Sequence, residues 1–126
     1  MNYNTIVADI IDWIRDLKLN IRLNNNLKEN SQGSTIIFSE TDNIQEIKST
    51  AKDYLSYMKK LFEKADEDNL NMNKTNINKS LNRLNEEIQT FVQQNTMKVS
   101  VIDTLTKLEN NIINIIKNKN LQPKFD

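Results

Sequence analysis

The chain has 126 residues, of which 37% are hydrophobic and 27% charged, and its 17 basic residues balance its 17 acidic ones. This length suits one domain with its own core, and the balanced charge gives no net field that would draw the chain to nucleic acid or an anionic membrane. The absence of Cys and His excludes disulfides, thiolate chemistry and imidazole as a base or metal ligand.

The first predicted helix covers residues 3–29. Its apolar residues recur in steps of four and three and form one seam: Tyr3, Val7, Ile10, Ile14, Leu17 and Ile21. This spacing is typical of a helix that packs on other helices. Asp9, Asp12 and Asp16 share the opposite face. We interpret them as solvated side chains rather than metal ligands, because metal sites in bundles use Glu and His that face the core.

Residues 30–43 form the clearest break, and they contain Gly33, the only glycine. The apolar run Ile36-Ile37-Phe38 has the composition of a short strand, but an isolated strand has no hydrogen-bonding partner. We therefore expect an ordered loop that places Ile37 or Phe38 on the bundle.

The second predicted helix covers residues 43–66, and Thr41 or Asp42 is expected to be its N-cap, since a short side-chain oxygen can accept a free backbone N–H. Its seam consists of Ile44, Ile47, Ala51, Tyr54, Met58, Leu61 and Ala65, and Leu55 and Phe62 widen it. The connection after it begins with Asp66 and Asp68 but lacks the ligand and glycine spacing of a calcium-binding loop.

Two further helices are predicted over residues 75–93 and 99–118, followed by a short tail over 119–126. Their seams are Ile77, Leu81, Leu84, Ile88 and Phe91 in the first, and Val101, Leu105, Leu108, Ile112 and Ile115 in the second. No Gly or Pro separates them, so one long helix with a polar bulge is the alternative.

These patterns predict an all-α protein, a small antiparallel bundle of three to four helices with a long loop after the first, forming one domain over residues 1–126. The longest apolar runs span three residues, too short for a signal peptide or a membrane span, so a cytoplasmic location is expected and leaderless secretion stays open. The 21 Asn, 16 Ile and 14 Lys against 3 Arg indicate an AT-rich genome, that of a low-GC bacterium or its phage.

Two helices carry more apolar residues than one seam requires. Leu19, Leu23 and Leu27 form a surplus stripe on the first helix, and Ile102, Ile113 and Ile116 form another on the last. Such stripes mark either a partner site or a helix that is covered on two sides. The candidate partner-binding residues are therefore Leu19, Leu23, Leu27, Ile113 and Ile116.

The sequence contains no nucleophile–base pair and no phosphate-binding loop, so we expect a protein without enzymatic activity, cofactor or metal. The favoured function is a protein–protein interaction module of the adaptor, inhibitor, immunity or chaperone type, which binds another protein or a second copy of itself. The alternative is a self-assembling structural subunit or a small subunit of a nucleoprotein complex. Direct nucleic-acid binding is not favoured, because residues 71–126 hold eight basic against five acidic residues without a dense basic face.

Overall fold

The structure is a computed structural model that describes residues 2–25 and 34–125, and within these ranges it contains four helices and two short strands. The elements are α1 (Tyr3–Asn25), β1 (Thr35–Ile37), α2 (Asp42–Glu67), α3 (Lys74–Gln94), β2 (Thr96–Lys98) and α4 (Val101–Asn118). The all-α prediction is confirmed. The last residues of the first predicted helix, 26–29, lie outside the described residues.

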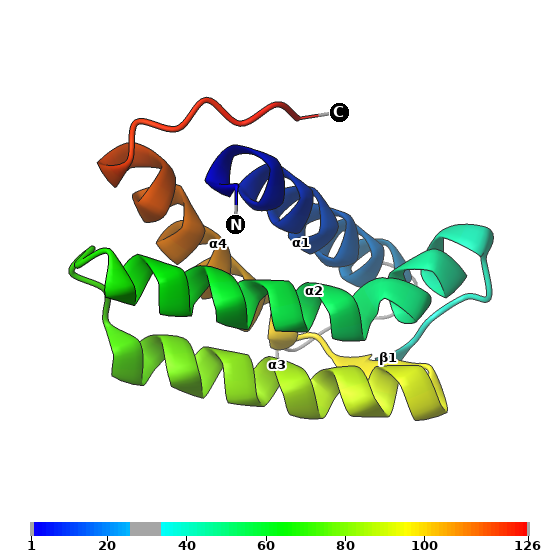
Figure 1. Ribbon diagram of the computed structural model, residues 1–126. Helices are drawn as coiled ribbons and strands as arrows, with labels where there is room; N and C mark the ends of the chain where they lie inside the picture. Colours follow the sequence, from blue (N-terminus) through cyan, green and yellow to red (C-terminus); the bar gives the residue numbers. More distant parts are fainter. Residues whose placement is uncertain (1, 26–33, 126) are drawn as a thin grey trace.

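The helices form an antiparallel bundle in which α1 and α3 each pack on both α2 and α4 (Figure 1). The predicted seams supply its core: apart from the half-buried Tyr3 and Tyr54, every seam residue is buried. Ile11 and Trp13 are also buried, because α1 is covered on two sides. None of the described helices has the length and hydrophobicity that crossing a membrane would need.

Side-chain caps fix where two of the helices begin. The Thr41 hydroxyl oxygen accepts a hydrogen bond from the Ile44 amide at 3.1 Å. Of the two predicted candidates, Thr41 and Asp42, Thr41 is therefore the N-cap of α2. The Asn73 side chain caps α3 in the same way by accepting from the Asn76 amide at 3.2 Å. Each bond satisfies a backbone N–H that has no partner within the helix.

A small antiparallel sheet corrects the prediction for residues 36–38. The strand β1 pairs with β2, with Ile36 opposite Met97, so the predicted loop is in part a strand. Its partner comes from the α3–α4 connection, about sixty residues further along, which no local pattern reveals. Ile36 and Phe38 are buried in the core, so of the two residues expected to pack on the bundle, Ile37 or Phe38, it is Phe38 that does so, whereas Ile37 is 65% exposed.

Asn95 separates α3 from α4, so the alternative of one continuous helix is wrong. Its backbone is left-handed, with φ 59° and ψ 31°, and its amide donates to the Phe91 carbonyl at 3.0 Å. Its side chain reaches across to β1, where Nδ2 donates to the Phe38 carbonyl oxygen at 2.7 Å. One residue therefore ends a helix and anchors the small sheet.

We expect Asn95→Ala to destabilise the protein by about 2 kcal/mol, because it removes a hydrogen bond and places a Cβ-bearing residue without a polar side chain in left-handed backbone. Asn95→Gly should cost only about 1 kcal/mol, since glycine tolerates the backbone conformation and only the side-chain bond is lost. Urea unfolding of both variants measures the difference. Equal losses would show that the positive φ contributes nothing.

Candidate interaction surfaces

The structure separates the five predicted partner-binding residues into three groups. Leu19 and Leu23 on α1 are 51% and 55% exposed. Leu27 lies outside the described residues. Ile113 and Ile116 are half-buried and pack against the core, as does Ile102. On α4 the surplus stripe is therefore largely covered by the protein itself, and α1 keeps the more exposed apolar pair.

Leu19 and Leu23 lie on the outer face of α1, between the side that packs on α2 and the side that packs on α4. On one side Asn43 of α2 donates from Nδ2 to Asp16 Oδ1 at 3.2 Å. On the other side Lys18 lies 2.8 Å from Glu109 of α4. At 100° per residue both leucines point away from the buried Leu17. We call this pair the α1 outer face.

The three aspartates of α1 lie at its junction with α2 instead of facing solvent fully. Asp9 is exposed, but Asp12 and Asp16 are half-buried and border a cavity of about 220 Å³ that also touches Trp13 and Tyr54. The Trp13 and Tyr54 rings stack with centroids 5.5 Å apart. Burial, followed by the negative charge of Asp9, raises the pKa of Tyr54. Among the residues described, no group of three or more acidic side chains is arranged to hold a metal ion.

Two acidic residues at the end of α2 and the start of the α2–α3 connection, Asp66 and Asp68, are paired with neighbouring side chains. Asp68 accepts a hydrogen bond from the Tyr3 hydroxyl at 2.7 Å and lies 3.2 Å from Lys119 Nζ. These two contacts, the Tyr3 hydrogen bond first, hold the pKa of Asp68 below its usual value. Asp66 forms an ion pair with Lys74 at 2.9 Å. Both carboxylates therefore join elements of the fold and are not free for a ligand.

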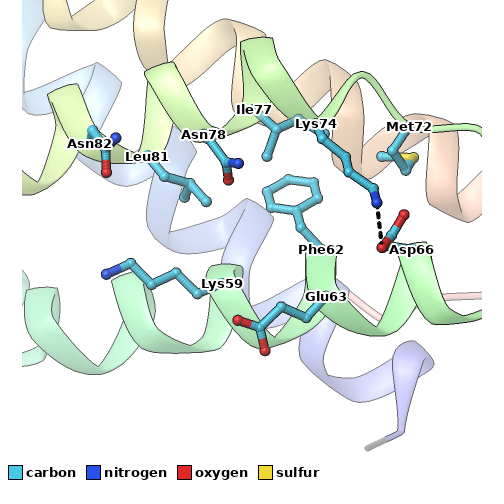
Figure 2. Close-up of a pocket in the computed structure, with 10 residues that line it drawn as sticks. All are labelled: Lys59, Phe62, Glu63, Asp66, Met72, Lys74, Ile77, Asn78, Leu81 and Asn82. Carbon is cyan, nitrogen blue, oxygen red and sulfur yellow. Dashed lines mark ion pairs between the residues drawn. The ribbon is translucent and has the colours of Figure 1, made fainter.

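A groove runs between α2 and α3, and its first part is a cavity of about 330 Å³ beside the α2–α3 connection. Figure 2 shows Phe62 rising from one helix toward Ile77 and Leu81 on the other, with Asn78 beside them. Phe62, Ile77 and Leu81 are nearly buried, so they form an apolar floor. Polar side chains stand at its edges.

A second cavity of about 450 Å³ borders the same two helices and shares Lys59 with the first. Leu55 and Ile88 are its buried apolar residues. We call the two cavities together the α2–α3 groove. Its α2 wall carries Lys52, Lys59 and Glu63, all exposed, and its α3 wall carries five carboxamides: Asn78, Asn82, Asn85, Gln89 and Gln93.

The apolar pattern of the sequence does not reveal this groove, and an AT-rich genome accounts for the asparagine content as a whole without it. The signal was present in the spacing: the five carboxamides follow one another at intervals of four, three, four and four residues. That spacing places them on one face of a helix. Apolar periodicity indicates which face of a helix is in the core. Polar periodicity on the same helix indicates which side chains share an exposed face.

No protein-family model matches the chain. Comparisons with curated proteins and with solved structures likewise found no match. What the surfaces bind is therefore inferred from their geometry and chemistry.

Proposed function

We propose that this protein is a non-enzymatic interaction module that binds another protein through the α1 outer face. The exposure of Leu19 and Leu23, one helical turn apart, is the observation that supports the proposal. Covering the exposed half of each leucine would contribute about 1 kcal/mol. Because the pair alone is small, we expect it to be the centre of a larger contact that extends over neighbouring polar residues.

The side chains around the α1 outer face favour a protein partner over a nucleic acid. Asp12 and Asp16 border it toward α2, and Arg15 is bound to Glu109 at 3.3 Å, so the two acidic side chains offset the exposed Arg22 beside the leucines. The cysteine-free composition fits a reducing compartment, and we propose the cytoplasm of a low-GC bacterium, or of one infected by its phage, as the setting.

The variant Leu19→Glu with Leu23→Glu tests this proposal. Proteins that the wild type retains from a low-GC bacterial extract should be retained by the variant in amounts at least about tenfold lower. The reason is that two carboxylates would face an apolar partner surface. Circular dichroism should show unchanged helicity, since both positions face outward. The matched control is Asn110→Glu with Asn114→Glu, which adds the same charges at the same spacing to exposed positions of α4.

Light scattering at several concentrations distinguishes a different partner from a second copy. Growth in mass with concentration that the leucine variant abolishes would assign the face to self-association, the alternative function. Collapse of the helical signal in the leucine variant would mean that both residues belong to the core. Equal retention by variant and wild type would remove the α1 outer face as a binding surface.

A further inference from the structure

We propose that the α2–α3 groove is a second docking surface, which holds an extended, acidic segment of a partner protein. The groove lies on different helices from the α1 outer face and shares no residue with it. Either proposal can therefore fail without the other. Three features of the groove lead to this occupant: its unused carboxamides, its apolar floor and its unpaired lysines.

The carboxamides supply hydrogen-bonding capacity that the described part of the chain does not use. No side-chain hydrogen bond joins any of the five to another described residue, whereas Asn20, Asn24, Asn95 and Asn111 all donate to backbone carbonyls. A carboxamide offers two N–H donors and a carbonyl acceptor, which together match the N–H and C=O of a peptide group. A row of them on one wall is suited to bind polypeptide backbone.

The spacing of the row fits an extended chain. Asn78 and Gln93 are 15 residues apart, which corresponds to about 22 Å along a helix and about 5.6 Å between neighbouring carboxamides. A β-type extended chain repeats every two residues at about 6.6 Å, so successive carboxamides come within reach of every second peptide group. The row would therefore hold about seven residues, with alternate side chains directed to the same side.

The floor of the groove provides apolar contacts for those alternate side chains. Phe62, Ile77 and Leu81 line the first cavity, and Leu55 and Ile88 line the second. The two cavities, of about 330 and 450 Å³, leave room for side chains of the bound segment above these nearly buried residues. The segment should thus carry apolar residues at two positions that face the floor.

The charge of the α2 wall favours an acidic segment, because its two lysines outnumber its one carboxylate that forms no ion pair with a described residue, Glu63. Lys52 and Lys59 are exposed, and neither forms an ion pair with a described residue, whereas Lys74 at the end of the groove is already bound to Asp66. They are seven residues apart, so they lie on one side of α2 about 10 Å from each other. Asp or Glu side chains of the segment would complement both. A nucleic-acid strand fits less well, because two lysines are few for a phosphate chain and Phe62 is only 6% exposed for stacking.

Two synthetic heptapeptide pools test the inference by NMR. Both have capped ends and apolar residues at alternate positions, and the positions between carry Asp and Glu in one pool and Lys and Arg in the other. We expect the acidic pool to bind at least about tenfold more tightly. It should shift the side-chain NH₂ signals of the five carboxamides, which report directly on the proposed contacts.

Variants with matched controls identify the groups responsible. Asn82→Ala with Gln89→Ala should weaken acidic-pool binding about tenfold, the loss expected for two hydrogen bonds, whereas Asn110→Ala with Asn114→Ala on α4 should leave it unchanged. Lys59→Glu should reverse the preference between the pools. Lys60→Glu places the same charge change one residue away, outside the groove lining, and should not reverse it.

Several results would overturn the inference. These are equal binding of the two pools, binding of neither, unshifted carboxamide signals, or competition by a seven-nucleotide oligothymidylate as strong as that by the acidic pool. Circular dichroism of each variant shows whether the bundle is intact, and the wild-type shifts do not depend on any variant folding. None of these outcomes changes the retention assay for the α1 outer face, because that assay varies Leu19 and Leu23.

Discussion

Leu84→Asp is expected to unfold the protein. Leu84 has no exposed surface and lies in the seam of α3, where the helix packs on α2 and α4. The substitution removes a buried leucine, worth about 2–5 kcal/mol, and places a carboxylate among apolar neighbours. Either effect is large beside the 5–15 kcal/mol that typically holds a domain together, and their sum approaches or exceeds it. Leu61→Asp, in the seam of α2, should act in the same way.

A thermal melt followed by circular dichroism measures this effect, with Asp12→Ala as the control. Asp12 is half-buried at the α1–α2 junction and has no hydrogen bond or ion pair to another described residue. Its removal should change stability by less than about 0.5 kcal/mol. If Asp12→Ala unfolded the protein and Leu84→Asp did not, the buried and exposed faces of the helices would be assigned the wrong way round.

The helical part of the fold could be predicted because one physical rule determines it. Apolar residues that recur at three and four positions must share a helix face, and a face of that width is stable only when it is covered. This rule found the seams of all four helices. It missed the burial of Trp13, because a single seam describes one contact, and α1 lies against both α2 and α4.

The two-stranded sheet could not be predicted from periodicity. Three residues are too few to show alternation, and the strand 35–37 is meaningful only with its partner 96–98. What fixes the pair is the geometry of the bundle, which brings the two connections to the same place, and the left-handed turn at Asn95. Contacts between segments distant in the sequence determine such a sheet, and a local sequence pattern does not indicate them.

The interaction surfaces were predicted less completely than the fold. The surplus stripes left open, for both helices, whether the residues are exposed or covered by a second neighbour; in the structure Leu19 and Leu23 are exposed, whereas Ile113 and Ile116 pack against the core. The difference depends on how many neighbours each helix has, which the sequence of one helix does not contain. Whether the exposed pair binds a partner stays a prediction.

The second large effect is expected at Glu109 on α4, whose carboxylate joins two cations of α1. Lys18 Nζ lies 2.8 Å from Oε1, a close ion pair that lacks the alignment of a hydrogen bond, and Arg15 Nε donates to Oε2 at 3.3 Å. Lys18 and Glu109 are each only 9% exposed, so this pair is largely removed from water. Lys18 Nζ also donates a hydrogen bond to Thr106 Oγ1, at 3.3 Å.

Glu109→Leu should destabilise the protein by about 3–5 kcal/mol, because it leaves the Lys18 ammonium buried without its counter-charge. Adding Lys18→Met should restore most of that loss, since two apolar side chains of similar size replace the ion pair without desolvating a charge. Arg15→Ala should cost less than about 1 kcal/mol, because the Arg15 side chain is 53% exposed and water screens its attraction to Glu109. Urea unfolding of the single and double variants gives the coupling energy between Lys18 and Glu109. A double variant no more stable than Glu109→Leu alone would show that the loss comes from packing around α4, and that the charge of Lys18 is accommodated by solvent.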